Sequence, residues 1–264
     1  MVRLHLGLIL YLGSVASAYG QGAPEVTKKI LYVESKPRWE FRYLRVILSR
    51  HRDADVKCLM TDGDEDLPKT SDSYLAAFPK EKKEIAKYDL IIIGDVAASY
   101  FTADQRKWLD ELVAEKGAAM IFVAGPAYTA ASFKEWKRLM PVAAGKEGRQ
   151  KIADDVHAVL SAEGIKWLQY RPQAEEHDVA WSAVRSFGEL PALSAQKDAV
   201  ILATLSKQKD KINPYPLIAW QKYGKGKTMY VGADQLWRMR STAGDQYHAQ
   251  FWSAAIRLMT VAEK

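Results

Sequence analysis

The first half of the chain alternates short apolar runs with segments of helical spacing, and this alternation limits the folds it can adopt. Four runs have the length of a buried strand, and they are Lys29–Glu34, Asp55–Asp62, Tyr88–Asp95 and Ala118–Gly125. The third run contains three consecutive isoleucines, which is typical of a central parallel strand covered on both faces. The alternation therefore predicts an α/β protein with an open, doubly wound, mainly parallel sheet and helices on both sides.

The segments between these runs carry helix signals. Pro37 stands where the first helix would begin, and apolar residues then recur on one helical face from Trp39 to Leu48. Thr102 predicts the N-cap of a later helix, and Gly117 predicts its end.

The second half changes character and predicts an antiparallel hairpin region added to the sheet. Closely spaced strands are expected at 199–205, 217–223 and 227–231, and the glycines around Lys225 favour a hairpin between the last two. The Lys-rich segment 146–173, which contains a short strand-like run HAVLS, is interpreted as an excursion from the main sheet. An amphipathic helix is expected at 249–261.

The N-terminus has the pattern of a targeting signal. Met1–Ala18 contains one early arginine, an apolar run and the small residues Ala-Ser-Ala before a cleavage point, so we expect a signal peptide cut after Ala18. An uncleaved anchor is the alternative. A flexible lead-in (19–27) and one domain (28–263) would follow, with no later membrane span. This organisation predicts an exported protein, periplasmic or extracellular.

Composition narrows the class of protein. Hydrophobic residues make up 48% and charged residues 27%, which is the balance of a folded chain. The single cysteine, Cys58, excludes an internal disulfide framework and is expected to be buried in a strand.

The formal net charge is +6, and part of the positive charge gathers near the expected hairpins. This edge could contact anionic lipid or polysaccharide, or could protect exposed strands from pairing, and nucleic acid is not expected. It comprises Lys207, Lys209, Lys211, Lys222, Lys225 and Lys227.

Ligands of open parallel sheets bind beyond the carboxyl ends of the strands, and polar and aromatic residues gather there in this chain. Tryptophan offers a flat stacking face, arginine can grip a carboxylate or phosphate, and the carboxylates can hold either an arginine or a ligand. The same residues could equally lock loops together. The candidate ligand-binding residues are Glu34, Arg38, Trp39, Glu40, Asp95, Gly125, Asp234, Trp237, Arg238 and Asp245.

Several blocks, taken in their order, resemble the class I glutamine amidotransferase-like domains of bacterial exported or membrane proteins. They are ILYVESKPRWEFRYLR (30–45), GAAMIFVAGPAYTAASF (117–133), LMPV (139–142), and YGKGKTMYVGADQLWRMR followed by GDQYHAQFWSAAIR (223–257). The resemblance implies a flavodoxin-like α/β fold, which by itself says little about activity.

The resemblance also implies a catalytic cysteine after a central strand and a His-Glu pair after a late strand. The corresponding positions read Gly125-Pro126-Ala127-Tyr128 and Val231-Gly232-Ala233-Asp234-Gln235, so both parts of that machinery are missing. Ordinary glutaminase chemistry is therefore not expected.

Three functions remain open from the sequence. The first is a non-catalytic amidotransferase-like domain of the cell envelope that binds a small ligand or a protein partner at the strand ends. The second is a scaffolding component of an envelope assembly. The third is a hydrolase of different chemistry that uses Asp234, Glu34 or His248. No cofactor or metal is predicted, because the histidines and cysteine lack metal-ligand spacing.

Overall fold

The computed structural model describes residues 27–51, 53–128, 132, 134–151, 156–168, 180–184, 189–206 and 215–261. The predicted signal peptide and all but the last residue of the lead-in lie outside this set, so the expected cleavage and export stay predictions. Among the helices of the described ranges, none combines the length and the apolar character needed to cross a membrane.

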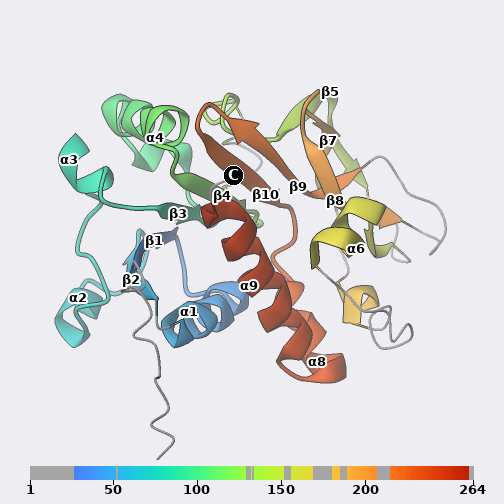
Figure 1. Cartoon of the computed structure of the whole chain (residues 1–264), viewed down its shortest axis with the longest axis horizontal. Coiled ribbons are helices and arrows are strands. Elements are labelled where there is room, and N and C mark those ends of the chain that lie inside the picture. Colours follow the sequence, from blue (N-terminus) through green and yellow to red (C-terminus); the bar gives the residue numbers. More distant parts are fainter. Residues whose placement is uncertain are drawn as a thin grey trace, which may run out of the picture.

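An eight-stranded mixed sheet forms the centre of the molecule (Figure 1). Its order is β2-β1-β3-β4-β10-β9-β8-β6. Neighbouring strands from β2 to β10 are parallel, and those from β10 to β6 are antiparallel. The strands are β1 (Lys28–Glu34), β2 (Ala54–Met60), β3 (Leu90–Ile93), β4 (Ala119–Val123), β6 (His157–Leu160), β8 (Val200–Ser206), β9 (Pro216–Tyr223) and β10 (Gly226–Val231).

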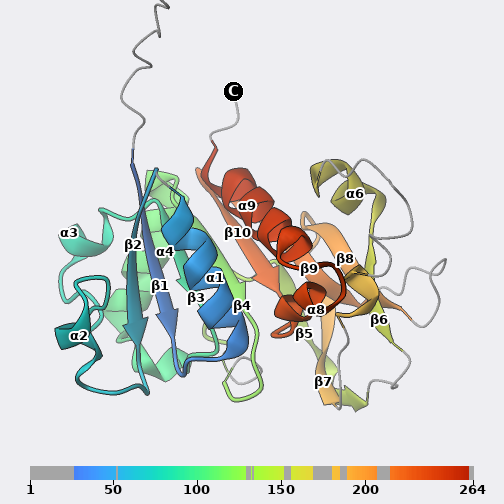
Figure 2. The ribbon, with the colours of Figure 1, turned by 90° about the horizontal axis from the view of Figure 1, so that it is seen from below.

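Helices cover both faces of this sheet. Figure 2 shows α1 and α9 side by side on one face, with α4 on the other. Short helical turns lie in the connections. The helical elements are α1 (Trp39–Arg50), α2 (Leu67–Thr70), α3 (Lys82–Ile85), η1 (Ala98–Tyr100), α4 (Ala103–Lys116), α6 (Ala162–Leu168), η2 (Leu236–Met239), α8 (Arg240–Ala243) and α9 (Gln246–Thr260).

The alternation of side chains along the parallel strands explains this layering. In β1, Ile30 and Tyr32 belong to the core beneath α1 and α9, whereas Leu31 and Val33 belong to the core beneath α4. All four are buried. Because both faces are covered, the strand reads as a continuous apolar run.

Local signals predicted the ends of several elements. Thr102 and Gln105 form a reciprocal capping box at the start of α4, and Gly117 ends that helix in a left-handed conformation, with φ of 80°. The hairpin between β9 and β10 turns at Gly224, whose φ is 59°. Cys58 is buried in β2, as expected.

The predicted fold class was a flavodoxin-like, doubly wound, mainly parallel sheet with an added hairpin. That prediction was wrong in its finer part, and only the broad α/β class holds. The protein is α/β, but its sheet is mixed, and the antiparallel strands continue the same sheet instead of forming an addition. The last parallel strand, β10, lies between β4 and β9 and joins the two halves.

The interpretation of 146–173 as an excursion was wrong in part. The run HAVL forms β6, which pairs with β8 at the edge of the main sheet. A separate two-stranded sheet, β5 (Val142–Lys151) with β7 (Glu189–Ala195), was not predicted. Its strands are mixed in polarity and lack a regular alternation, so their residues carry no strand signal.

Candidate functional site

The carboxyl ends of the parallel strands bring separate segments of the chain to one edge of the sheet. Glu34 ends β1, Asp95 follows β3, Gly125 follows β4, and Asp234 follows β10. Their order in the sheet explains the proximity, because β1, β3, β4 and β10 are successive neighbours.

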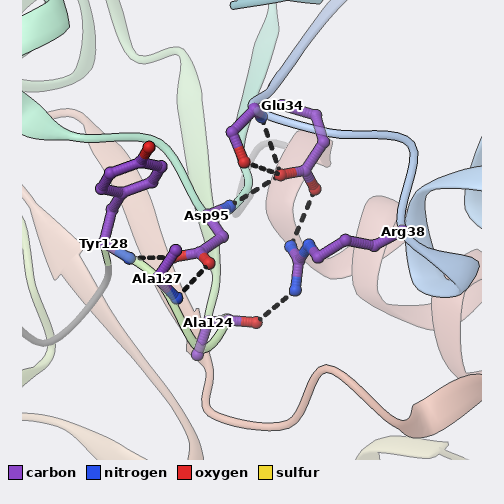
Figure 3. A network of polar contacts seen from close by, with 7 residues as sticks. Glu34, Arg38, Asp95, Ala124, Ala127 and Tyr128 are labelled. Atoms are coloured by element: carbon purple, nitrogen blue, oxygen red, sulfur yellow. Dashed lines mark hydrogen bonds and ion pairs between the residues drawn. The ribbon is translucent and has the colours of Figure 1, made fainter. Parts of the chain in front are cut away.

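Glu34 is the centre of a buried polar network (Figure 3). Its Oε2 accepts a hydrogen bond from Nη2 of Arg38 at 2.8 Å, and its Oε1 accepts from the backbone N–H groups of Ser35 at 2.9 Å and Asp95 at 3.0 Å. Burial raises the pKa of the Glu34 carboxyl, and the Arg38 guanidinium opposes that shift.

Arg38 extends this network to the next strands. Its Nη1 donates to the carbonyl oxygen of Ala124 at 2.9 Å, at the end of β4 (Figure 3). Burial is the largest single influence and would lower the pKa of the guanidinium, but the charge and hydrogen bond of Glu34, together with the charges of Tyr32 and Asp95, raise that pKa above its ordinary value. The Nε of Arg38 is buried and has no hydrogen-bond partner among the described residues.

Asp95 shapes the loop that follows β4. Its two carboxylate oxygens accept from the N–H groups of Ala127 at 2.6 Å and Tyr128 at 2.7 Å (Figure 3). This holds the loop so closely that a Cβ atom at Gly125 would lie 2.4 Å from Cβ of Asp95 and 2.6 Å from Nη1 of Arg38. The position therefore requires glycine because of the close approach.

Glu40 is a buried cross-link between α1 and the C-terminal region. Its Oε1 contacts Nε2 of His248 and accepts from Nε1 of Trp252, both at 2.7 Å, and its Oε2 accepts from the N–H of Trp237 at 2.8 Å. Glu40, His248 and Trp252 are fully buried. These contacts position the C-terminal loop, and they leave His248 out of reach of a solvent-borne substrate.

Asp234 differs from the other carboxyls because it is only partly buried. Burial raises the pKa of its carboxyl; the positive charge of Arg38 opposes this, and the negative charges of Glu40 and Asp95 add to it. A carboxyl with a raised pKa that solvent can reach is a candidate for donating and accepting a proton in catalysis.

Aromatic rings gather near this part of the sheet edge: Trp39 stands between Arg38 and Glu40, whose charges act on Asp234, and Trp237 follows Asp234 by three positions. The ring centroids of Trp39 and Trp237 are 5.9 Å apart, and Tyr43 lies 5.8 Å from Trp39 and 6.3 Å from Trp237. We call these three residues the aromatic shelf. The structure thus brings together the two predicted Trp-Arg segments, although they are about 200 positions apart in the sequence.

Arginines stack on each ring of the shelf. The guanidinium of Arg42 lies 5.2 Å from the ring centroid of Trp39, that of Arg238 lies 4.9 Å from Trp237, and that of Arg240 lies 3.8 Å from Tyr43. Asp245 is connected to the shelf through Arg240: its carboxylate forms an ion pair with that arginine at 2.7 Å, and the arginine stacks on Tyr43.

Sequence reasoning missed Tyr43 and Arg240 as members of this arrangement. Tyr43 is four positions after Trp39 in a segment predicted to be helical, so the i,i+4 spacing could have placed the two rings together. Arg240 had no comparable signal, because its position depends on the turn formed by η2 and α8.

The predicted positive edge is only partly present in the described residues. Lys222 and Lys225 are exposed on the hairpin, but Lys227 is buried, and its Nζ donates to the carbonyl oxygens of Leu258 and Val261 at 2.8 and 2.9 Å. Lys207, Lys209 and Lys211 lie outside the described residues. Contact with an anionic surface stays a prediction.

Among the residues that the structure describes, no three or more His, Cys, Asp or Glu side chains are grouped so that they could hold a metal ion. A surface groove of about 460 Å³ lies elsewhere, near the amino end of β3, where it is lined by residues that include Phe78, Glu84 and Tyr88.

No family model matches the chain, and no curated protein matches it. Among solved structures, it is similar to a cytoplasmic protein from Salmonella typhimurium, with 14% identity over 89% of this chain and 100% of the other, and a TM-score of 0.57. This likeness concerns the fold alone.

Two longer proteins also align. A β-galactosidase from Rahnella sp. R3 has 15% identity over 90% of this chain and 32% of its own, with a TM-score of 0.47. The carbohydrate deacetylase Agd3 has 11% identity over 89% and 32%, also with a TM-score of 0.47. The chain spans about a third of the length of each.

These comparisons correct the resemblance to class I glutamine amidotransferase-like domains. No family model of that or any other kind matches, and the similar Salmonella structure is not described as an amidotransferase. The function derived from that resemblance, a non-catalytic amidotransferase-like domain of the envelope, is corrected with it.

Proposed function

We propose that the chain is a hydrolase that uses the carboxyl group of Asp234 for acid–base catalysis. One observation carries this proposal: Asp234 is a partly exposed carboxyl at the end of a parallel strand, and burial raises its pKa. Perturbed carboxyls at strand ends are more common in catalytic sites than elsewhere on a protein surface.

The groups around Asp234 support a role in proton transfer for Asp234 and other roles, in positioning or charge stabilisation, for its neighbours. The oxygens of Glu34, Glu40 and Asp95 accept hydrogen bonds from the protein itself, so these carboxylates act as positioning residues. Arg38 is held by Glu34 and supplies a fixed positive charge near Asp234. Such a charge would stabilise an oxygen that becomes negative during bond cleavage.

The proposed reaction needs only water and one carboxyl group. Protonated Asp234 donates its proton to the leaving oxygen as the substrate bond breaks. The oxygen of a water molecule bonds to the electrophilic carbon, and the extra proton of that water returns to Asp234. The carboxyl is then ready for another cycle.

The variant Asp234→Asn tests this role, because an amide has the same shape but cannot transfer a proton. Purified full-length protein would be assayed with nitrophenyl esters and nitrophenyl glycosides. We expect kcat to fall about 100-fold or more in the variant, with a smaller change in KM. In the unmodified protein, kcat should decrease as the pH rises through the pKa of Asp234, since the protonated form is active.

Asp104→Asn is the matched control, because Asp104 is an exposed carboxyl in the first turn of α4, on the face of the sheet opposite to α1. It should keep the activity of the unmodified protein. The proposal fails if none of these substrates is turned over, or if Asp234→Asn is as active as Asp104→Asn.

A scaffolding role is the second candidate, and the density of internal contacts favours it. Glu34, Glu40 and Asp95 each join segments that are distant in the sequence, as expected of residues that hold loops in place. A protein that hydrolyses none of the substrates above but forms a stable complex with an envelope protein would support this role.

A further inference from the structure

The aromatic shelf is exposed to an extent that folding does not require. Trp39 is 53% exposed, although tryptophan is among the side chains most stabilised by burial. Trp237 and Tyr43 are partly exposed beside it. Large apolar rings that gather at the surface commonly mark a site of interaction.

The rings are held in fixed positions. Glu40 anchors the backbone of Trp237 through its N–H, and Tyr43 and Trp39 occupy successive turns of α1. The ring planes of Trp39 and Tyr43 differ by 20°, and those of Trp39 and Trp237 by 37°. A preorganised aromatic surface binds a ligand without losing side-chain freedom at that moment.

The polar groups around the shelf can pair with the hydroxyl groups of a ligand. Arg42, Arg238 and Arg240 stack on its rings and supply donors, and the carboxyl of Asp234 supplies an acceptor or, when protonated, a donor. Hydroxyl groups can donate to a carboxylate and accept from a guanidinium, as Asp234 and Arg238 would require. A pyranose ring combines such hydroxyls with an apolar C–H face that can pack on an indole ring.

We infer that the aromatic shelf binds a pyranose unit of a saccharide next to Asp234. This inference rests on the proposed function and names its substrate class. The bond cleaved is then the glycosidic C–O bond: Asp234 protonates the leaving oxygen, water bonds to the anomeric carbon, and its extra proton returns to Asp234. Trp39 and Trp237 bind and orient the sugar and take no part in proton transfer.

The test measures binding separately from cleavage. Full-length protein would be titrated with β-1,4-linked hexaoses of glucose, mannose and N-acetylglucosamine, and with hexagalacturonate, by calorimetry and by tryptophan fluorescence. We expect at least one hexaose to bind, and Trp39→Ala and Trp237→Ala each to weaken that binding about tenfold or more.

Tyr100→Ala is the control for loss of an exposed aromatic ring. Tyr100 is 38% exposed and packs on Phe101, which belongs to the core on the opposite face of the sheet. This variant should bind the hexaose as the unmodified protein does. Circular dichroism would verify folding of each variant, and Trp39→Phe would replace Trp39→Ala if the latter does not fold.

The outcomes separate the inference from the proposed function. If a hexaose binds through the shelf but no glycoside or ester is cleaved, the inference stands and the hydrolase proposal fails. If esters are cleaved but no hexaose binds, the hydrolase proposal stands and the saccharide inference fails. The inference is also overturned if Trp39→Ala and Trp39→Phe both bind the hexaose normally, or if ATP binds the shelf more tightly than every hexaose.

Discussion

Asp234 links the proposed chemistry to the stability of the fold. In an unfolded chain an aspartate ionises near pH 3.9, whereas burial raises the pKa of Asp234 in the folded protein. The folded state therefore holds this proton more tightly. Its contribution to stability is complete below about pH 4 and is lost as the pH rises through the folded pKa.

Asp234→Asn should remove this pH dependence, because the amide stays neutral. We expect the free energy of unfolding of the variant, relative to that of the unmodified protein, to increase as the pH rises from about 4 towards neutrality. Urea unfolding at several pH values measures the difference. A difference that stays constant over this range would show that Asp234 titrates alike in both states.

Gly125 provides a steric test of the loop that Asp95 holds. A methyl group at this position would lie within 2.6 Å of atoms of both Asp95 and Arg38, so Gly125→Ala should be destabilised by about 1–3 kcal/mol. Urea unfolding compares it with Ser99→Ala, a change at an exposed position. Equal stability of the two variants would show that the loop relaxes without loss.

At the scale of elements, Lys227 ties β10 to the end of α9. Its ammonium group donates to two carbonyl oxygens in the last turn, where the helix dipole also favours a positive charge. Lys227→Met should lower the free energy of unfolding by about 1–3 kcal/mol. Lys225→Met, at the exposed turn of the same hairpin, should change it little, and similar losses in both variants would contradict this account.

Elements with a strong local pattern were predictable. The apolar runs of β1, β3 and β4, the cap at Thr102 and the glycine turn at Gly224 depend on residues close in sequence. The strand-like run HAVLS was recognised from the sequence, but the pairing of β6 with β8 at the edge of the main sheet depends on a partner far along the chain. The separate sheet of β5 and β7 also depends on distant partners, and its residues show no regular period, so local reasoning could not place it.

In the candidate site, too, some features follow from the local sequence and others depend on residues far along the chain. The strand-end rule nominated Glu34, Asp95 and Asp234 because the sheet edge determines their position. The rule could not separate a carboxylate that serves the fold from one that solvent reaches. Whether a carboxylate serves the fold depends on donors such as Trp252 and the N–H of Tyr128, which the tertiary fold brings to Glu40 and Asp95.

At the scale of the whole molecule, β10 joins the parallel and antiparallel halves of the sheet. It pairs with β4, more than 100 positions earlier in the chain, and with β9. A chain ending at residue 214 would lack β9, β10 and α9, and would leave β4 with an unpaired edge and the part of the core beneath α9 uncovered.

We therefore expect the chain of residues 1–214 to show no cooperative unfolding transition in urea, in contrast to the full chain. Circular dichroism and sedimentation would measure folding and aggregation. A soluble fragment with a sharp transition would show that the parallel strands form an independent folding unit.

The burial of Cys58 has a practical consequence for labelling. Burial raises the pKa of its thiol to about 11, and the side chain is 1% exposed in the middle of β2. The thiolate is the form that attacks alkylating reagents, so this buried, protonated sulfur is protected while β2 stays paired. A cysteine introduced at an exposed position could therefore carry a fluorophore or spin label without removal of the native one, and slow modification of Cys58 would itself record how often the strand opens.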